Sequence, residues 1–194
     1  MAMANRLVFN SLRSSRVKKG IREGKRRSKG FSLIELIIAV ALLALVLVLG
    51  IPTFSGVLAS MRVRSVAEGM LGGIQMARTE AMRRNQPVTF SLDSEDGGGW
   101  SVRLVSDATV LQTKSAGEGG AVVAQSDLGH TLTFNNLGQR IVPAGGALSF
   151  SLSNPDVAPC QPSGNVRCLT IVVQPSGQVR LCDPQRAAPD PQAC

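Results

Sequence analysis

An apolar run that carries a single charge dominates the N-terminal quarter of this sequence. Residues 31–51 form a stretch of twenty-one residues before Pro52, and Glu35 is the only charged residue among them. As an α-helix with a rise of 1.5 Å per residue, this stretch would extend over ~31 Å, the thickness of the hydrocarbon core of a bilayer. The sequence therefore predicts a helix over residues 31–52 that crosses a membrane or forms a filament core, with a kink at Pro52.

The charges are distributed unevenly on the two sides of this run. Residues 1–30 contain ten Lys and Arg and one Glu, a net charge of +9, whereas residues 31–194 carry a net charge of −1. An excess of Lys and Arg keeps its end of a membrane helix in the cytoplasm, so we expect the N-terminus inside and the C-terminal domain outside. A nucleic-acid-binding tail is the alternative for residues 1–30. A secretory signal peptide is the alternative for the apolar run, although such peptides have shorter apolar cores without Glu.

Glu35 needs a partner if the apolar run is buried in hydrocarbon. A carboxylate there costs at least ~2.5–3.5 kcal/mol, and such groups usually pair. Cleavage after Gly30 would create an ammonium group on Phe31, one helical turn away. Between two chains, the amine of one subunit could neutralise Glu35 of its neighbour and fix their axial register. The alternative is that Glu35 reaches the headgroups by itself.

The rest of the chain predicts an α+β protein. Helical periodicity resumes after Pro52 over residues 53–86 and ends near Arg84, before Asn85-Gln86-Pro87. The apolar positions expected to pack on the domain are Val57, Leu58, Met61, Met70, Leu71, Ile74, Ala77, Ala81 and Met82. Gly69, Gly72 and Gly73 indicate either a bend or close packing. Residues 87–194 alternate with period two, which predicts an antiparallel domain with strands over 87–92, 100–105, 108–113, 121–125, 131–135, 147–152, 168–173 and 179–182.

All four cysteines lie in the last 35 residues, beyond the apolar run, which indicates disulfides in an oxidising compartment. A two-residue hairpin loop at Ser176-Gly177 would place Cys182 opposite Ile171 and not opposite Cys168. A turn at residues 162–165 would let Cys160 pair with Cys168, and Cys182 with Cys194 would then hold the Pro-rich tail. We favour these two pairs among the three pairings that four cysteines allow. The cysteine spacing and the single histidine, His130, disfavour zinc, and we expect no cofactor, metal or catalytic group.

The segment Lys29-Gly30-Phe31-Ser32-Leu33-Ile34-Glu35 resembles the class III signal of type IV pilins and type II secretion pseudopilins. The resemblance implies that a prepilin peptidase cuts after Gly30 and N-methylates Phe31, so that residues 1–30 are a cleaved leader. It also implies that Glu35 acts in assembly with other pilins or pseudopilins, that Pro52 kinks the helix, and that the protein resides in the inner membrane before it enters a filament.

Residues 75–85, Gly99-Trp100-Ser101-Val102 and residues 133–138 are similar to motifs of the GspH/FimT family. The resemblance leaves two expectations open: a minor pilin of a type IV pilus-type filament, and a GspH-like pseudopilin of the type II secretion system. Some FimT-like members bind DNA through a Gly-Arg-x-Arg pattern. Here the pattern is Gly177-Gln178-Val179-Arg180, so Arg180 matches and Gln178 replaces the first arginine. Arg140, Arg167 and Arg186 could supply further phosphate contacts if they converge.

Overall fold

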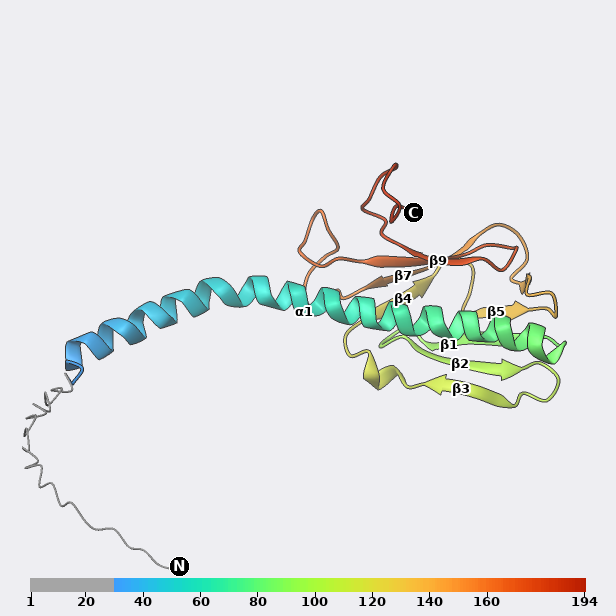
Figure 1. Ribbon diagram of the computed structural model, residues 1–194, viewed down its shortest axis with the longest axis horizontal. Coiled ribbons are helices and arrows are strands. Elements are labelled where there is room, and N and C mark those ends of the chain that lie inside the picture. Colours follow the sequence, from blue (N-terminus) through green and yellow to red (C-terminus); the bar gives the residue numbers. More distant parts are fainter. Residues whose placement is uncertain (1–29) are drawn as a thin grey trace, which may run out of the picture. The chain divides into compact units, whose positions relative to one another are not determined.

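One long helix, α1 (Leu33–Arg84), precedes an all-antiparallel β domain in the computed structural model (Figure 1). The structure describes residues 30–194, without the side chains of residues 49–53, so the predicted leader lies outside the described residues except for Gly30. The chain divides into two units within α1, Met1–Ala41 and Leu42–Cys194. The second unit contains the whole β domain and is described first.

The C-terminal end of α1 is fixed by a hydrogen-bonded cap. Asn85 has a positive φ of 53°, in the left-handed region that asparagine tolerates. The N–H of Gln86 donates to the carbonyl of Ala81, and the N–H of Asn85 donates to that of Met82. This is the Schellman pattern, which satisfies two carbonyls that a helix end leaves without partners. The helix therefore ends at Arg84, as the sequence predicts.

The face of α1 that packs on the domain differs from the predicted one. Met70, Ile74, Ala77 and Ala81 are fully buried, as expected. Four of the other predicted apolar positions are exposed instead, namely Val57, Leu58, Met61 and Met82. Smaller or β-branched residues take the buried positions near the start of this stretch, namely Gly56, Ala59, Val63, Val66 and Ala67. Periodicity by itself cannot distinguish two adjacent apolar faces of one helix, and here the face with the smaller side chains lies against the domain.

Two of the three glycines in the middle of α1, Gly69 and Gly73, allow close packing. A side chain at Gly73 would lie 2.9 Å from the Trp100 ring, and one at Gly69 would lie 2.8 Å from the Lys114 Nζ. Helix α1 continues through all three positions. The explanation that holds at Gly69 and Gly73 is therefore close approach of the neighbouring side chains.

The domain contains two antiparallel sheets. Sheet A has the strand order β3-β2-β1-β5-β6, and sheet B has the order β4-β7-β8-β9. The strands are β1 (Val88–Ser94), β2 (Gly99–Leu104), β3 (Val110–Lys114), β4 (Val123–Ser126), β5 (Thr131–Phe134), β6 (Arg140–Val142), β7 (Leu148–Ser153), β8 (Leu169–Val173) and β9 (Val179–Cys182), with a short 3-10 helix, η1 (Ala116–Glu118), between β3 and β4. A shared core joins the sheets: the ring of Phe90 in β1 contacts Trp100 in β2 and Phe150 in β7, at centroid distances of 5.7 and 6.2 Å.

Two details differ from the expectations. Strand β6 was not predicted, because three residues beside Pro143 are too short to show a period of two. The β8–β9 hairpin has a three-residue loop, Pro175-Ser176-Gly177, closed by the N–H of Gln174 donating to the carbonyl of Gln178. Gly177, with a φ of 83°, provides the left-handed position that such loops need. Cys182 therefore lies opposite Thr170, one residue from the predicted register.

Two disulfides close the C-terminal part of the domain. Cys160 pairs with Cys168, and Cys182 pairs with Cys194. These are the two pairs that the sequence favours. The first closes a loop ahead of β8, and the second connects the end of β9 to the tail of residues 183–194.

Candidate functional site

The predicted processing and assembly residues lie at the start of α1, in the first unit. Apart from Gly30 and its chain neighbours, no described residue has an atom within 4 Å of the place that a Cβ on Gly30 would take, and Phe31 is 84% exposed. Residues 30–32 are not helical, and α1 begins at Leu33. Glu35 therefore lies in the first turn, where a carboxylate also interacts favourably with the helix dipole. The described residues of this unit, 30–41, contain no Lys, Arg or His that could pair with it.

The large apolar side chains between Phe31 and Val48 are exposed, with fractions from 52% to 84%. Among the described residues, no helical segment has both the length and the hydropathy that a membrane crossing requires. Helix α1 is continuous through Pro52. Whether Pro52 kinks it stays a prediction, because the side chains of residues 49–53 lie outside the described part.

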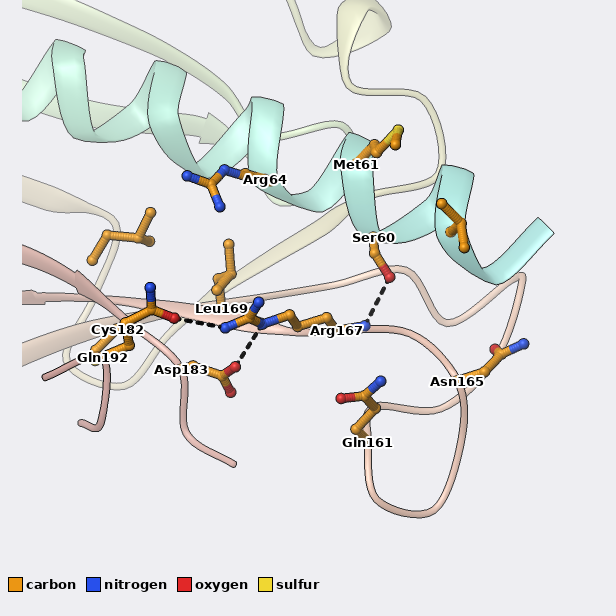
Figure 2. Close-up of a pocket in the computed structure, with 12 residues that line it drawn as sticks. Ser60, Met61, Arg64, Gln161, Asn165, Arg167, Leu169, Cys182, Asp183 and Gln192 are labelled. Carbon is orange, nitrogen blue, oxygen red and sulfur yellow. Dashed lines mark hydrogen bonds and ion pairs between the residues drawn. The ribbon is translucent and has the colours of Figure 1, made fainter. Parts of the chain in front are cut away.

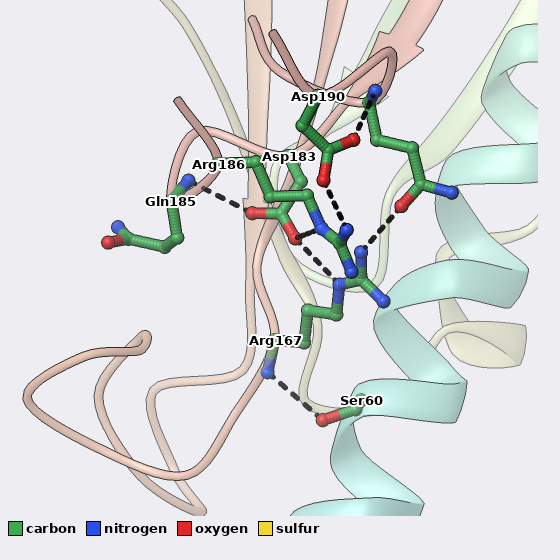
Figure 3. Close-up of polar contacts among 7 residues, drawn as sticks. Ser60, Arg167, Asp183, Gln185, Arg186 and Asp190 are labelled. Carbon is green, nitrogen blue, oxygen red and sulfur yellow. Dashed lines mark hydrogen bonds and ion pairs between the residues drawn. The ribbon is translucent and has the colours of Figure 1, made fainter. Parts of the chain in front are cut away.

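Two of the predicted DNA-contacting arginines converge on one acidic residue. Arg167 donates from Nε to Oδ2 of Asp183 at 2.7 Å, and Arg186 Nε lies 3.6 Å from the same oxygen (Figure 3). The Asp183 side chain is only 5% exposed and also accepts the backbone N–H of Gln185 at 2.9 Å. Arg186 pairs in addition with Asp190. The pKa of Asp190 is lowered by the hydrogen bond from the Gln192 backbone and by Arg186. These guanidinium groups are therefore already paired with carboxylates.

Arg180 and Arg140 lie elsewhere and also have partners within the chain. One terminal nitrogen of Arg180 donates to the main-chain oxygens of Ala193 and Cys194, at 2.7 and 2.9 Å, so that Arg180 holds the tail beside the Cys182–Cys194 disulfide. Arg140 in β6 is 5% exposed and donates to the carbonyls of Pro143 and Gly146. Burial lowers its pKa. Arg140 therefore stabilises the β6–β7 connection between the two sheets, and its partners differ from those of Arg167 and Arg186.

A cleft of about 470 Å³ lies between α1 and the two disulfide-closed segments (Figure 2). Ser60, Met61 and Arg64 line the α1 side. Leu169 and Leu181 from β8 and β9 supply apolar surface. The remaining polar lining includes Gln161 and Arg167 of the loop closed by the first disulfide. The segment closed by the second disulfide adds Asp183 and Gln192.

A polar network connects the walls of this cleft. The Ser60 hydroxyl donates to the Gly56 carbonyl at 2.8 Å and accepts the backbone N–H of Arg167 at 3.0 Å. The Arg167 side chain continues the network to Asp183 and to Oε1 of Gln192. Sequence reasoning missed this group, because Asp183 and Gln192 are 123 and 132 residues from Ser60 and no local pattern connects them. The cleft combines apolar surface, amides and guanidinium groups, a composition suited to binding another protein.

Two family descriptions match the sequence. That of the type II transport protein GspH matches residues 66–177, more than half of the chain. That of the prokaryotic N-terminal methylation motif matches residues 25–51, a range that includes Gly30, Phe31 and Glu35. A comparison with curated proteins finds no match.

Solved structures similar to this chain include a minor pilin and a minor pseudopilin. Two crystal forms of the type IV minor pilin FimU of Pseudomonas aeruginosa are 20% identical, with TM-scores of 0.50 and 0.51. The match covers 68% of this chain and 98% and 94% of those chains. The minor pseudopilin EpsH from the Type 2 Secretion System of Vibrio cholerae is 12% identical, with a TM-score of 0.45 and coverage of 64% and 99%. At these identities the FimU structures establish a shared fold.

Proposed function

The chain belongs to the family of the type II transport protein GspH and is a minor pilin or pseudopilin, and we propose that it enters a type IV pilus-type filament as a structural subunit after prepilin peptidase cleavage. The observation that supports the proposal is the methylation motif over residues 25–51, which includes the proposed cleavage position and the apolar first part of α1. Members of this family are structural subunits, which accords with the protein-binding character of the cleft. We assign the chain no catalytic role.

The proposed cleavage lies between Gly30 and Phe31. Both residues are exposed and precede the first helical residue, so a peptidase would meet a non-helical backbone there. The new N-terminus on Phe31 would be methylated by the same enzyme. The apolar run of residues 31–52 would hold the subunit in the inner membrane until assembly, with the basic leader in the cytoplasm and the β domain in the periplasm.

The experiment that tests this proposal is the mass of the protein extracted from bacterial membranes. We expect a chain that begins at N-methylated Phe31 and lacks residues 1–30. Gly30→Val should leave the full-length chain uncut, because a branched side chain would occupy the cleavage position. Gly24→Val, in the same leader, is the matched control and should be processed as the wild type is. An uncut wild-type chain in a strain with an active prepilin peptidase would contradict the proposal.

The alternative is a GspH-like pseudopilin of the type II secretion system, and the family description itself names type II transport. The two machines differ in what a deletion strain loses. We expect loss of piliation with protein secretion intact. Loss of secretion with normal piliation would instead assign the chain to the secretion machine.

DNA binding stays a prediction, and the contacts of the arginines do not favour it. Arg167 and Arg186 pair with acidic residues, and Arg180 donates to main-chain oxygens of the tail. A duplex DNA titration at low and moderate salt, with wild type and Arg180→Ala, tests the prediction. If the wild type contacts phosphates, its affinity should fall as the salt concentration rises. The slope of log affinity against log salt concentration should then be smaller in magnitude by about one in Arg180→Ala. Equal absence of binding in both proteins would eliminate DNA as a partner.

A further inference from the structure

Four large apolar side chains form an exposed stripe on the part of α1 that belongs to the β domain's unit. Phe54, Val57, Leu58 and Met61 are 64%, 47%, 40% and 61% exposed. Their spacing of three, one and three residues places them on one face of the helix. Isolated exposed apolar residues need no explanation, but a contiguous stripe of this kind marks an interaction surface.

Specific contacts hold this stripe outward. On the opposite face, a Cβ at Gly56 would lie 2.5 Å from the Asn165 side chain of the first disulfide loop. Ala59 is 1% exposed, and the Ser60 hydroxyl binds the backbone of Arg167 at 3.0 Å. Rotating α1 to bury the stripe would break the Ser60 contact and drive larger side chains into Asn165. The stripe is therefore fixed on the outer side of a packed helix.

The stripe continues into the cleft. Val57 and Met61 belong to both, and Leu169 and Leu181 extend the apolar surface beneath α1. Gln161 and Gln192 provide amides on the other walls, and both disulfide-closed segments contribute to these walls. We call the stripe and the cleft together the docking face. A concave surface with polar walls suits a protein element better than a lipid chain, which cannot satisfy the amides.

The charges at the end of the stripe indicate what the partner carries. No Lys, Arg, Asp or Glu occurs from Leu36 to Met61, and Arg62 and Arg64 follow immediately. Arg62 is exposed and has no ion pair with the described residues, whereas Arg64 forms an exposed pair with Glu68 at 2.8 Å. Two copies of this chain in register would bring these arginines together, which is unfavourable. The surface is therefore complementary to a different chain that carries a carboxylate.

We propose that the docking face receives an α-helix of a second, different filament subunit, whose apolar stripe lies on Phe54, Val57 and Met61 and ends in a carboxylate that pairs with Arg62 or Arg64. This inference rests on the proposed function, because it needs a filament partner. It adds that the subunit contacts of α1 continue beyond Pro52 onto the β domain's unit and include the cleft rimmed by the two disulfides.

Site-specific photo-crosslinking of the full chain in cells tests the proposal. A benzophenone amino acid replaces Met61 in one strain and Leu137, which is 69% exposed on the β5–β6 turn, in the control strain. We expect an adduct from position 61 to a pilin-type protein of different sequence, mapped by mass spectrometry to a helix with an acidic residue within one turn of the adduct. Adducts to lipid alone, to a second copy of this chain, or equally from position 137 would overturn the proposal.

Charged variants provide a second, independent measurement. Met61→Glu places a carboxylate inside the docking face and should lower incorporation into filaments at least about tenfold. Met82→Glu is the matched control, since Met82 is an exposed methionine on the same helix at 43%, and it should stay within about twofold of wild type. Non-reducing gels check that both variants keep their disulfides. Equal incorporation of folded Met61→Glu refutes the docking face alone, whereas failure of the wild type to be cleaved or incorporated refutes the proposed function.

Discussion

Charged side chains near the end of α1 each have a defined structural role. Arg78 donates from Nε to the carbonyl of Gly138 at 3.1 Å and so connects the helix to the β5–β6 turn. Gly138 must remain small there, because a side chain would lie 2.8 Å from the Met82 sulfur. Glu80 accepts hydrogen bonds from Arg83 and Arg84 at 2.7 and 2.6 Å. Arg78, Arg83 and Arg84 at the end of the helix therefore stabilise the fold.

The Glu80 interactions predict a pH-dependent contribution to stability. Hydrogen bonds from Arg83 and then Arg84 lower the pKa of Glu80 from 4.5 to about 2. A lowered folded-state pKa adds stability that is present above pH 4.5 and is lost as the pH falls toward 2. We expect Glu80→Gln to lower the free energy of unfolding by about 0.5–1 kcal/mol at pH 7, the value of two helical ion pairs. Denaturant titrations of wild type and Glu80→Gln at pH 7 and at pH 2 measure this change in the free energy of unfolding. A change that is as large at pH 2 as at pH 7 would contradict this assignment.

The C-terminal tail is an element without regular secondary structure, yet it is held at several points. The N–H of Asp183 donates to the carbonyl of Gln192 at 2.7 Å, and Asp183 forms an isolated parallel bridge with Ala193. Arg180 binds the last two main-chain oxygens, and the Cys182–Cys194 disulfide closes the loop. These contacts place Gln192 and Asp183 in the wall of the cleft. The tail is therefore part of the docking face.

Removing either disulfide should lower stability, but only removal of Cys182–Cys194 should release the tail. Cys182→Ser/Cys194→Ser and Cys160→Ser/Cys168→Ser open loops with separations of 12 and 8 residues. Each double variant should lose about 2–3 kcal/mol by the loop-entropy relation. Only the first should become sensitive to trypsin after Arg186, because only its tail is released. Equal cleavage after Arg186 in both variants would show that the tail is not held independently.

At the scale of the whole molecule, processing and charge act together. The proposed leader, residues 1–30, carries a net charge of +9, and its removal would leave a chain whose side chains have a net charge of −1 and would create an amine on Phe31. The residues described around Glu35, 30–41, provide no cation. An amine from a neighbouring subunit would therefore neutralise Glu35 in the assembled state. Assembly would then supply the cationic partner that residues 30–41 do not provide through their side chains.

Pairing of Glu35 with an amine of a neighbouring subunit predicts a specific assembly defect. Glu35→Gln keeps the size of the side chain and removes its charge, so cleavage after Gly30 should be normal while filament incorporation falls about tenfold. Glu118→Gln, which changes an exposed carboxylate of η1 in the same way, should be incorporated as the wild type is. Quantitative immunoblots of sheared filaments and membranes provide the measurement. Unimpaired incorporation of Glu35→Gln beside wild-type partners would refute the pairing.

The sequence predicted much of the domain because its signals are local. The end of α1 follows from Asn85-Gln86-Pro87, and eight of the nine strands follow from alternation and turn residues. The two disulfide pairs follow from a turn and a hairpin, although the hairpin register was off by one residue. Strand β6 has only three residues, which is too short for alternation to be recognised. These residues form a strand because they pair with β5.

What the sequence by itself determined is the order of segments: a basic leader, an apolar helix with Glu35, an amphipathic continuation and a disulfide-closed β domain. Periodicity, charge and turn chemistry act within a few residues, so one sequence suffices for them. Only the tertiary structure decided which face of α1 is buried: Asn165 leaves no room for a side chain at position 56 and Ala59 is buried, whereas Val57, Leu58 and Met61 are exposed. It also decided which partners the arginines bind. Asp183 is 16 residues from Arg167 in sequence, and only folding brings their side chains to 2.7 Å.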